Sequence, residues 1–239
     1  MSIIIPAILP QSRADLEDKL ARLAEVAAID TVQVDAVDGR FAQPACWPYA
    51  TKGVLEGLVR ASQLLPQLGR LTLEADLMVD SPERAAHLWS ELGAARITIH
   101  ADSTTNLGRT IAEIRARHGH APGFAPGLFA LGLALPARSE VSLILPHLAQ
   151  LDYVQFMGIE REGRQAEPFS RAVLPKIRTL RTHAPLLSIQ VDGGVTLETA
   201  PEILAAGASQ LVVGHALWQA PSLAHAIARF DALANSHAS

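Results

Sequence analysis

Acidic side chains end three short apolar segments of this chain. Asp35, Asp76 and Asp192 each close such a segment, and helix-like segments separate them along the sequence. In a parallel α/β barrel the carboxyl ends of all the strands meet at one rim, which is where such barrels carry their catalytic side chains. Carboxylates gathered at one rim repel one another and lose hydration, so they need a cation, shared protons or a bound substrate.

Short apolar segments alternate with longer segments of helical periodicity over all 239 residues. The predicted strands cover residues 3–9, 31–36, 71–78, 96–100, 128–135, 153–157, 187–191 and 210–213. The predicted helices cover residues 12–27, 51–65, 82–92, 105–118, 139–148, 170–181, 197–206 and 221–234. Eight strands, each followed by a helix, are typical of a (β/α)8 TIM barrel, an α/β fold. We expect one such domain over residues 1–239.

Side-chain alternation along these strands predicts a polar barrel interior. Polar residues share one face in each of four strands: Thr31, Gln33 and Asp35; Thr72, Glu74 and Asp76; Thr98 and His100; Ser188, Gln190 and Asp192. A parallel strand that is buried on both faces is normally almost entirely apolar. The pattern therefore predicts polar stripes that run up to the acids at the rim, and it makes Asp35 a functional candidate.

Glycines follow the last two predicted strands. Gly193 and Gly194 come directly after Asp192, and Gly214 follows the eighth strand. Glycine lets backbone N–H groups approach an anion closely, and helices that begin there add a positive dipole. Barrel enzymes commonly bind a phosphate between the loops after strands seven and eight. These glycines therefore indicate either a phosphate site or two tight turns.

The composition limits the classes of partner. Hydrophobic residues make up 49% of the chain and aromatic residues 5%, which predicts a large aliphatic core. A net charge of −4 gives no electrostatic basis for binding nucleic acid or an anionic membrane. The single cysteine, Cys46, excludes an internal disulfide. Because no apolar run has the length of a membrane span and no signal-peptide pattern is seen, we expect a cytoplasmic protein.

Several stretches of the chain resemble the ribulose-phosphate 3-epimerase family, in the same order and with compatible spacing. They are residues 4–9, 33–41, 76–78, 99–101, 173–177, 191–194 and 213–214. The resemblance implies a barrel of the ribulose-phosphate-binding type, a ketose phosphate as substrate, and association into homo-oligomers. In this family one aspartate removes the C3 proton and a second returns a proton to the opposite face of an enediolate. By position these catalytic aspartates are Asp35 and Asp192.

The metal ligands implied by the resemblance depart from the family pattern. The family holds a divalent metal with two histidines and two aspartates, and Gln33 and Asp76 occupy the histidine positions here. The implied ligand set is therefore Gln33, Asp35, Asp76 and Asp192. A set made only of oxygen ligands suits Mg²⁺, Mn²⁺ or another hard cation better than Zn²⁺. Acids that are solvated at the barrel mouth without any metal are the alternative.

The resemblance also implies where the rest of the substrate binds. The expected pocket residues are Ala7, Met78, His100 and Met157. The expected phosphate-binding residues are Gly193, Gly194, Gly214, His215 and Arg164. Ala7 and His215 stand where the family usually has serines, and Arg164 lies in a loop with fewer glycines than the family loop. The two methionines fit ordinary core packing equally well.

Two other functions stay open beside the epimerase. A non-catalytic protein that binds a sugar phosphate is favoured by the loss of both histidines. A lyase or decarboxylase is compatible with strand-end acids and anion-binding loops, which related phosphate-binding barrels share. The pairing of acids on the second and seventh strands favours proton transfer.

Overall fold

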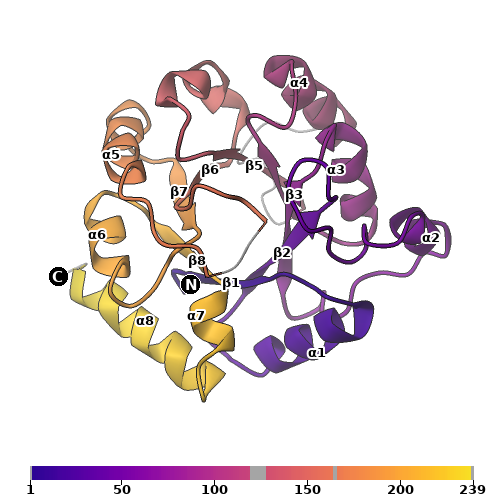
Figure 1. Ribbon diagram of the computed structural model, residues 1–239, viewed down its shortest axis with the longest axis horizontal. Coiled ribbons are helices and arrows are strands. Elements are labelled where there is room, and N and C mark those ends of the chain that lie inside the picture. The colour runs from indigo at the N-terminus through magenta and orange to yellow at the C-terminus, as the bar shows by residue number, and fades with distance from the viewer. Residues whose placement is uncertain (1, 119–127, 164–165, 238–239) are drawn as a thin grey trace.

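Eight parallel strands close into a barrel, and helices surround it (Figure 1). The computed structural model describes residues 2–118, 128–163 and 166–237. The strands are β1 (Ile4–Ile8), β2 (Thr31–Val37), β3 (Thr72–Met78), β4 (Arg96–His100), β5 (Ala130–Leu135), β6 (Tyr153–Met157), β7 (Ser188–Asp192) and β8 (Gln210–Val213). Neighbours in sequence pair in parallel, and β1 pairs with β8 to complete the ring. The predicted (β/α)8 TIM barrel is confirmed, and each predicted strand end lies within two residues of the observed one.

The helices lie around the outside of this ring. They are α1 (Arg13–Ala24), α2 (Val54–Arg60), α3 (Pro82–Glu91), α4 (Leu107–His118), η1 (Val141–Leu143), η2 (Leu145–Gln150), α5 (Val173–His183), α6 (Ala200–Ala205), α7 (His215–Trp218) and α8 (Leu223–His237). The segment 139–148, predicted as one helix, forms the two 3₁₀ helices η1 and η2. Pro146 lacks a backbone N–H and its ring crowds the preceding turn, so an α-helix does not continue through it. None of the described helices has the length and apolar character needed to cross a membrane.

The outward faces of the strands pack against the helices and form the aliphatic core. Ile97 and Ile99 of β4 are fully buried in this layer. In α1, Leu16, Leu20 and Leu23 recur at the spacing of one helical turn, and all three are fully buried. One stripe of α1 therefore faces the barrel. Because burying a leucine side chain contributes about 1.5–3 kcal/mol, this outer layer supplies most of the apolar stabilisation.

The inward faces of the strands carry polar side chains. Those with no exposed area are Gln33, Glu74, Asp76, Thr98, His100, Gln155 and Gln190. The polar stripes predicted on β2, β3, β4 and β7 are thereby confirmed. Gln155 of β6 was missed by the sequence analysis, although Tyr153, Gln155 and Met157 alternate with apolar residues in the same way.

A glycine on β5 leaves room for an aromatic ring inside the barrel. Gly132 is the β5 partner of Tyr153 on β6, and a Cβ at Gly132 would lie 2.0 Å from the Tyr153 ring. The Arg96 guanidinium lies over this ring, 4.0 Å from its centroid, and the Tyr153 hydroxyl is 2.8 Å from Thr98 Oγ1. The missing side chain at position 132 therefore allows Tyr153 to fill the barrel below its mouth.

Gly132→Ala is expected to destabilise the protein. The added methyl group has to displace the ring of Tyr153, and overpacking of this kind costs about 1–3 kcal/mol. Urea unfolding measures the loss. Gly57→Ala is the matched control, because a Cβ there meets nothing within 4 Å. Since Gly57 lies within α2, alanine should instead stabilise by about 0.5–1 kcal/mol. Equal stability of the Gly132→Ala variant and the wild type would contradict the packing described here.

Candidate active site

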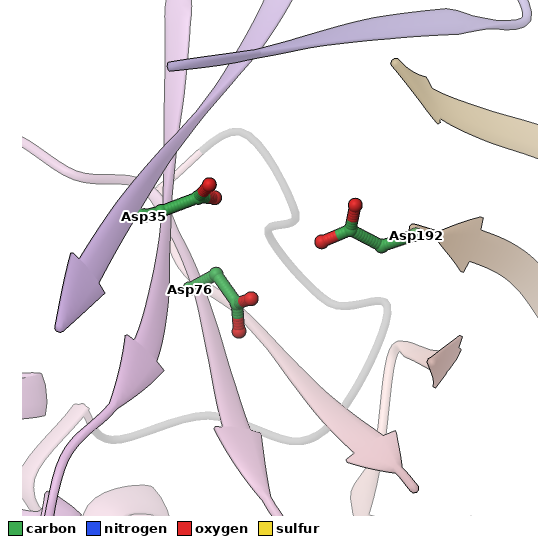
Figure 2. A group of neighbouring side chains, drawn as sticks. All are labelled: Asp35, Asp76 and Asp192. Carbon is green, nitrogen blue, oxygen red and sulfur yellow. The ribbon is translucent and has the colours of Figure 1, made fainter. Parts of the chain in front are cut away.

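Three aspartates from three strands meet at the mouth of the barrel. Asp35 lies on the inward face of β2, two residues before its end, Asp76 lies at the matching position of β3, and Asp192 is the last residue of β7. One carboxylate oxygen from each lies within 4.8 Å of the others. Figure 2 shows the Asp192 carboxylate facing those of Asp35 and Asp76. The convergence expected from the strand-end acids is therefore present, and the cluster has the ligand types and spacing to hold a metal ion.

The amide of Gln33 bridges two of these carboxylates. Gln33 Nε2 donates to Asp35 Oδ1 and to Asp192 Oδ2, both at 2.9 Å. Its other amide atom, Oε1, is buried and has no hydrogen-bond partner among the described residues. Asp35 Oδ2 and Asp192 Oδ1 accept no hydrogen bond from the described residues. Each of these two aspartates therefore keeps one oxygen that is not engaged.

Burial and crowding disturb the protonation of the cluster. Burial, followed by the charges of Asp192 and Asp76, raises the pKa of Asp35 well above its ordinary value of 3.8. Burial and the Asp76 charge raise the pKa of Asp192 to about 7. Burial by itself would lower the pKa of His100, but the Asp76 carboxylate raises it above its ordinary value of 6.5. The cluster therefore holds protons near neutral pH unless a cation compensates its charge.

Asp76 is held on both of its oxygens. His100 Nε2 lies 3.0 Å from Asp76 Oδ1, and Gln155 Nε2 donates to Asp76 Oδ2 over 3.3 Å. His100 is fully buried, and its ring lies at a tilt to Phe41 with 5.1 Å between the centroids. The structure thus places His100 behind Asp76, and it does not line the pocket that the sequence analysis assigned to it.

A pocket of about 350 Å³ opens above the acids. Of the residues expected from the sequence, it is lined by Ala7, Asp35, Met78, Met157, Asp192, Gly193, Gly194, Gly214 and His215. The loop after β6 supplies further lining that the sequence analysis did not identify, including Ile159, Glu167 and Phe169. Arg164 lies outside the described residues. The nearby Arg161 is ion-paired with Glu167, 2.9 Å apart.

The two glycines after β7 allow close packing of the pocket loops. Gly193 and Gly194 have φ values of +94° and +67°. A Cβ at Gly193 would lie 2.8 Å from Ile159, and one at Gly194 would lie 2.6 Å from the Cα of Phe169. Both glycines are therefore required sterically, and both also face the pocket. The helix after them, α6, begins only at Ala200, so it does not bring its dipole to Gly194.

Comparison with known proteins assigns the chain to a family. A model described as the ribulose-phosphate 3 epimerase family matches residues 3–218. The chain belongs to the ribulose-phosphate 3-epimerase family. It is 30% identical to the ribulose-phosphate 3-epimerase of Schizosaccharomyces pombe over 92% of this chain and 88% of that one. It is also 30% identical to the ribulose-phosphate 3-epimerase of Bacillus subtilis, over 90% and 91% of the two chains. These relatives are isomerases that act on carbohydrates.

Solved structures share the barrel of this epimerase-family chain at low sequence identity. The 3-hexulose-6-phosphate synthase of Salmonella typhimurium is 13% identical, with a TM-score of 0.67 over 99% of this chain and 100% of that one. The protein KGPDC from Streptococcus mutans is 14% identical, with a TM-score of 0.64 over 98% and 97% of the two chains. At such identity the likeness shows the fold alone.

Asp192→Asn should stabilise this epimerase-family protein when metal is chelated. The unfolded carboxyl ionises near pH 3.8 and the folded one near 7, so the folded state binds the extra proton between these values. The free energy of unfolding of the wild type therefore falls as pH rises through this window. In EDTA at pH 8 we expect the variant to be more stable by at least about 1 kcal/mol in urea unfolding, because one pKa unit corresponds to about 1.4 kcal/mol.

The pH dependence provides an internal check of that experiment. The difference between Asp192→Asn and the wild type should shrink towards pH 4, where the wild-type carboxyl is protonated in the folded state. Asp18→Asn is the control, because this side chain is 68% exposed on α1 and should change little at either pH. A variant at position 192 that is less stable than the wild type at pH 8 would show that the carboxylate is well accommodated.

Proposed function

We propose that this protein is an epimerase that moves the C3 proton of a ketose phosphate through an enediolate. The observation that carries the proposal is the pair Asp35 and Asp192, which line one pocket from β2 and β7. Each has one carboxylate oxygen bonded to Gln33 and one that accepts no hydrogen bond from the described residues. A two-base epimerisation needs two such groups, one to remove a proton and one to return it to the opposite face.

The protonation of the pair suits this chemistry. A general acid or base is most effective when its pKa lies near the working pH. Burial and the Asp76 charge bring the pKa of Asp192 to about 7, and burial raises that of Asp35 as well. One carboxyl can therefore be protonated while the other is ionised, which is the state that a two-base exchange requires at its start.

A hard divalent cation fits the cluster of three aspartates. Asp35, Asp76 and Asp192 would hold it with their carboxylates, whereas Gln33, the fourth expected ligand, faces two of these carboxylates with its Nε2. An all-oxygen set favours Mg²⁺ or Mn²⁺ over Zn²⁺. When bound, such an ion acts as a Lewis acid towards the oxygens of an enediolate. The role of Gln33 is to bring the two catalytic carboxylates together from below.

The remaining pocket residues would bind the rest of the substrate. Gly193, Gly194, Gly214 and His215 line one part of the pocket, and their backbone N–H groups would bind the phosphate there. Ala7, Met78 and Met157 would contact the sugar. The sugar phosphate is also the substrate class in the names of the curated relatives. Cytoplasmic location and self-association, which the sequence analysis expects, stay predictions.

A second candidate function is binding of a sugar phosphate without turnover. The observation that favours it is the replacement of both metal-binding histidines of the family by Gln33 and Asp76. Lyase chemistry through a Schiff base has no support in the described strands, because no lysine lies on any of them.

Deuterium exchange tests the epimerase. Ketose phosphates, starting with ribulose 5-phosphate, are incubated with the protein in heavy water and Mn²⁺, Mg²⁺ or Zn²⁺, and C3 deuteration is followed by NMR. We expect exchange by the wild type and a loss of at least about 100-fold in Asp35→Asn and in Asp192→Asn, because each removes a proton-transfer group. Asp18→Asn is the matched control and should keep full activity. Thermal stabilisation by sugar phosphates with no exchange under any condition would favour the binding protein instead.

Manganese titration tests the cation site independently of turnover. Chelated protein is titrated with Mn²⁺ and free ion is measured by electron paramagnetic resonance. The wild type should bind one ion, and Asp76→Asn should weaken the affinity by at least about tenfold, since it removes one of three anionic ligands. Asp18→Asn should bind as the wild type does. A wild type that binds no Mn²⁺ would contradict the cation assignment.

A further inference from the structure

A second buried polar layer lies directly beneath the acid cluster. It joins Glu74, Arg96 and Gln190, which come from β3, β4 and β7. Arg96 Nε donates to Glu74 Oε2 at 2.7 Å, and Arg96 Nη2 donates to Gln190 Oε1 at 3.0 Å. Gln190 Nε2 donates to Glu74 Oε1 and to Gln155 Oε1, both at 2.6 Å. The layer therefore connects Arg96 to Gln155, whose amide touches the acids above.

The chemistry of Arg96 gives this chain of hydrogen bonds one direction. A guanidinium group has only donors, so the amide atom of Gln190 that faces it must be the oxygen. The Gln190 NH2 group then faces Glu74 and Gln155, and the atom of Gln155 that meets it must again be the oxygen. The NH2 group of Gln155 is consequently turned upwards. This order follows from the donor types and does not depend on how either amide is assigned.

The upward NH2 group contacts two of the three carboxylates. Gln155 Nε2 lies 3.3 Å from Asp76 Oδ2 and 3.4 Å from Asp192 Oδ2. Gln33 Nε2 donates to the same Asp192 Oδ2 at 2.9 Å. Two amides therefore hold one oxygen of Asp192, and its Oδ1 is the oxygen left for the reacting proton. Asp76, in contrast, has both oxygens engaged, by Gln155 and by His100.

We propose that Gln155 is a positioning residue for the general acid or base Asp192, and that Arg96, acting through Gln190, fixes the orientation of the Gln155 amide. This inference rests on the proposed epimerase function. Asp76 is held through both of its carboxylate oxygens, whereas Asp192 is held through Oδ2 only. We call the hydrogen-bonded series Arg96, Gln190 and Gln155 the relay. Its removal should leave the substrate pocket unchanged and let the Asp192 carboxylate rotate.

Two variants and one matched control test the relay. Gln155→Met and Gln190→Met keep the side-chain length and remove the amide. Thr98→Val is the control, because Thr98 Oγ1 donates to Glu74 Oε1 at 2.9 Å beside the same layer, and among the described residues it hydrogen-bonds with neither Gln155 nor Gln190. Circular dichroism and urea unfolding confirm folding. The two methionine variants attack the relay at different links, so the test survives if one of them fails to fold.

Kinetics and side-chain NMR give the decisive readouts. In C3 deuterium exchange, both methionine variants should lower kcat about 10- to 100-fold with KM within about twofold of the wild type, since small misplacements of a reacting group have effects of this size. Thr98→Val should keep both constants. In ¹H–¹⁵N spectra, the Gln155 amide signals, identified by their loss in Gln155→Met, should shift in Gln190→Met and stay in place in Thr98→Val.

The outcomes separate this inference from the proposed function. An active wild type whose kcat survives Gln155→Met, or whose kcat falls as far in Thr98→Val, overturns the positioning role and leaves the epimerase standing. Gln155 amide signals that do not move in Gln190→Met overturn the relay whether or not any substrate is turned over. A wild type without exchange on any ketose phosphate overturns the proposed function, and with it the positioning role.

Discussion

Electrostatic repulsion among Asp35, Asp76 and Asp192 is the interaction around which the barrel mouth is arranged. Each aspartate is fixed to its own strand, and the strand register of a closed barrel does not let any of them move away. Burial strengthens the repulsion, because little water screens the charges. The compensation comes from N–H groups inside the barrel: the amides of Gln33 and Gln155 and the imidazole of His100. Raised pKa values of Asp35 and Asp192 show that this compensation is incomplete.

Because the repulsion among the three carboxylates is only partly compensated, it lowers the stability of the folded protein and favours binding of a ligand that removes it. Buried carboxylates without a full set of partners destabilise a folded protein. Binding of a cation or of a proton relieves the repulsion, so either is favoured at this cluster. The protein can carry this cost because its apolar packing lies elsewhere, between the outward strand faces and the helices. The barrel interior is thereby free to be polar, and hydrogen bonds determine its order.

The pocket walls show how one residue type can meet two requirements. Gly193 and Gly194 have positive φ angles and let the loop after β6 approach through Ile159 and Phe169. The same two residues also line the pocket. A glycine that close packing requires can therefore also be a pocket residue. Packing of the loop after β6 also brings Glu167 to the pocket, and this carboxylate neutralises the charge of Arg161 by ion pairing.

The sequence by itself determined the barrel and the members of the acid cluster. Alternation of strands and helices sets the fold class, and the period of two along a strand sets which side chains face inwards; both are local properties of the chain. That is why Asp35, Asp76 and Asp192 could be identified before any contact was known. The prediction of one α-helix over residues 139–148 was wrong. Its apolar spacing suits a helix, but Pro146 has no backbone N–H to continue the hydrogen bonding of an α-helix.

Only the tertiary structure decided which polar side chains hydrogen-bond to one another inside the barrel. Gln33 bridges Asp35 and Asp192, the second of which lies 159 positions away from it along the chain. This bridge depends on barrel closure and strand register, which local periodicity does not encode. The same holds for His100, which stands behind Asp76 instead of lining the pocket, and for Gln155, whose orientation depends on contacts from other strands. Side-chain direction along a strand is a local matter, but hydrogen-bond partners across a barrel are fixed by distances in space.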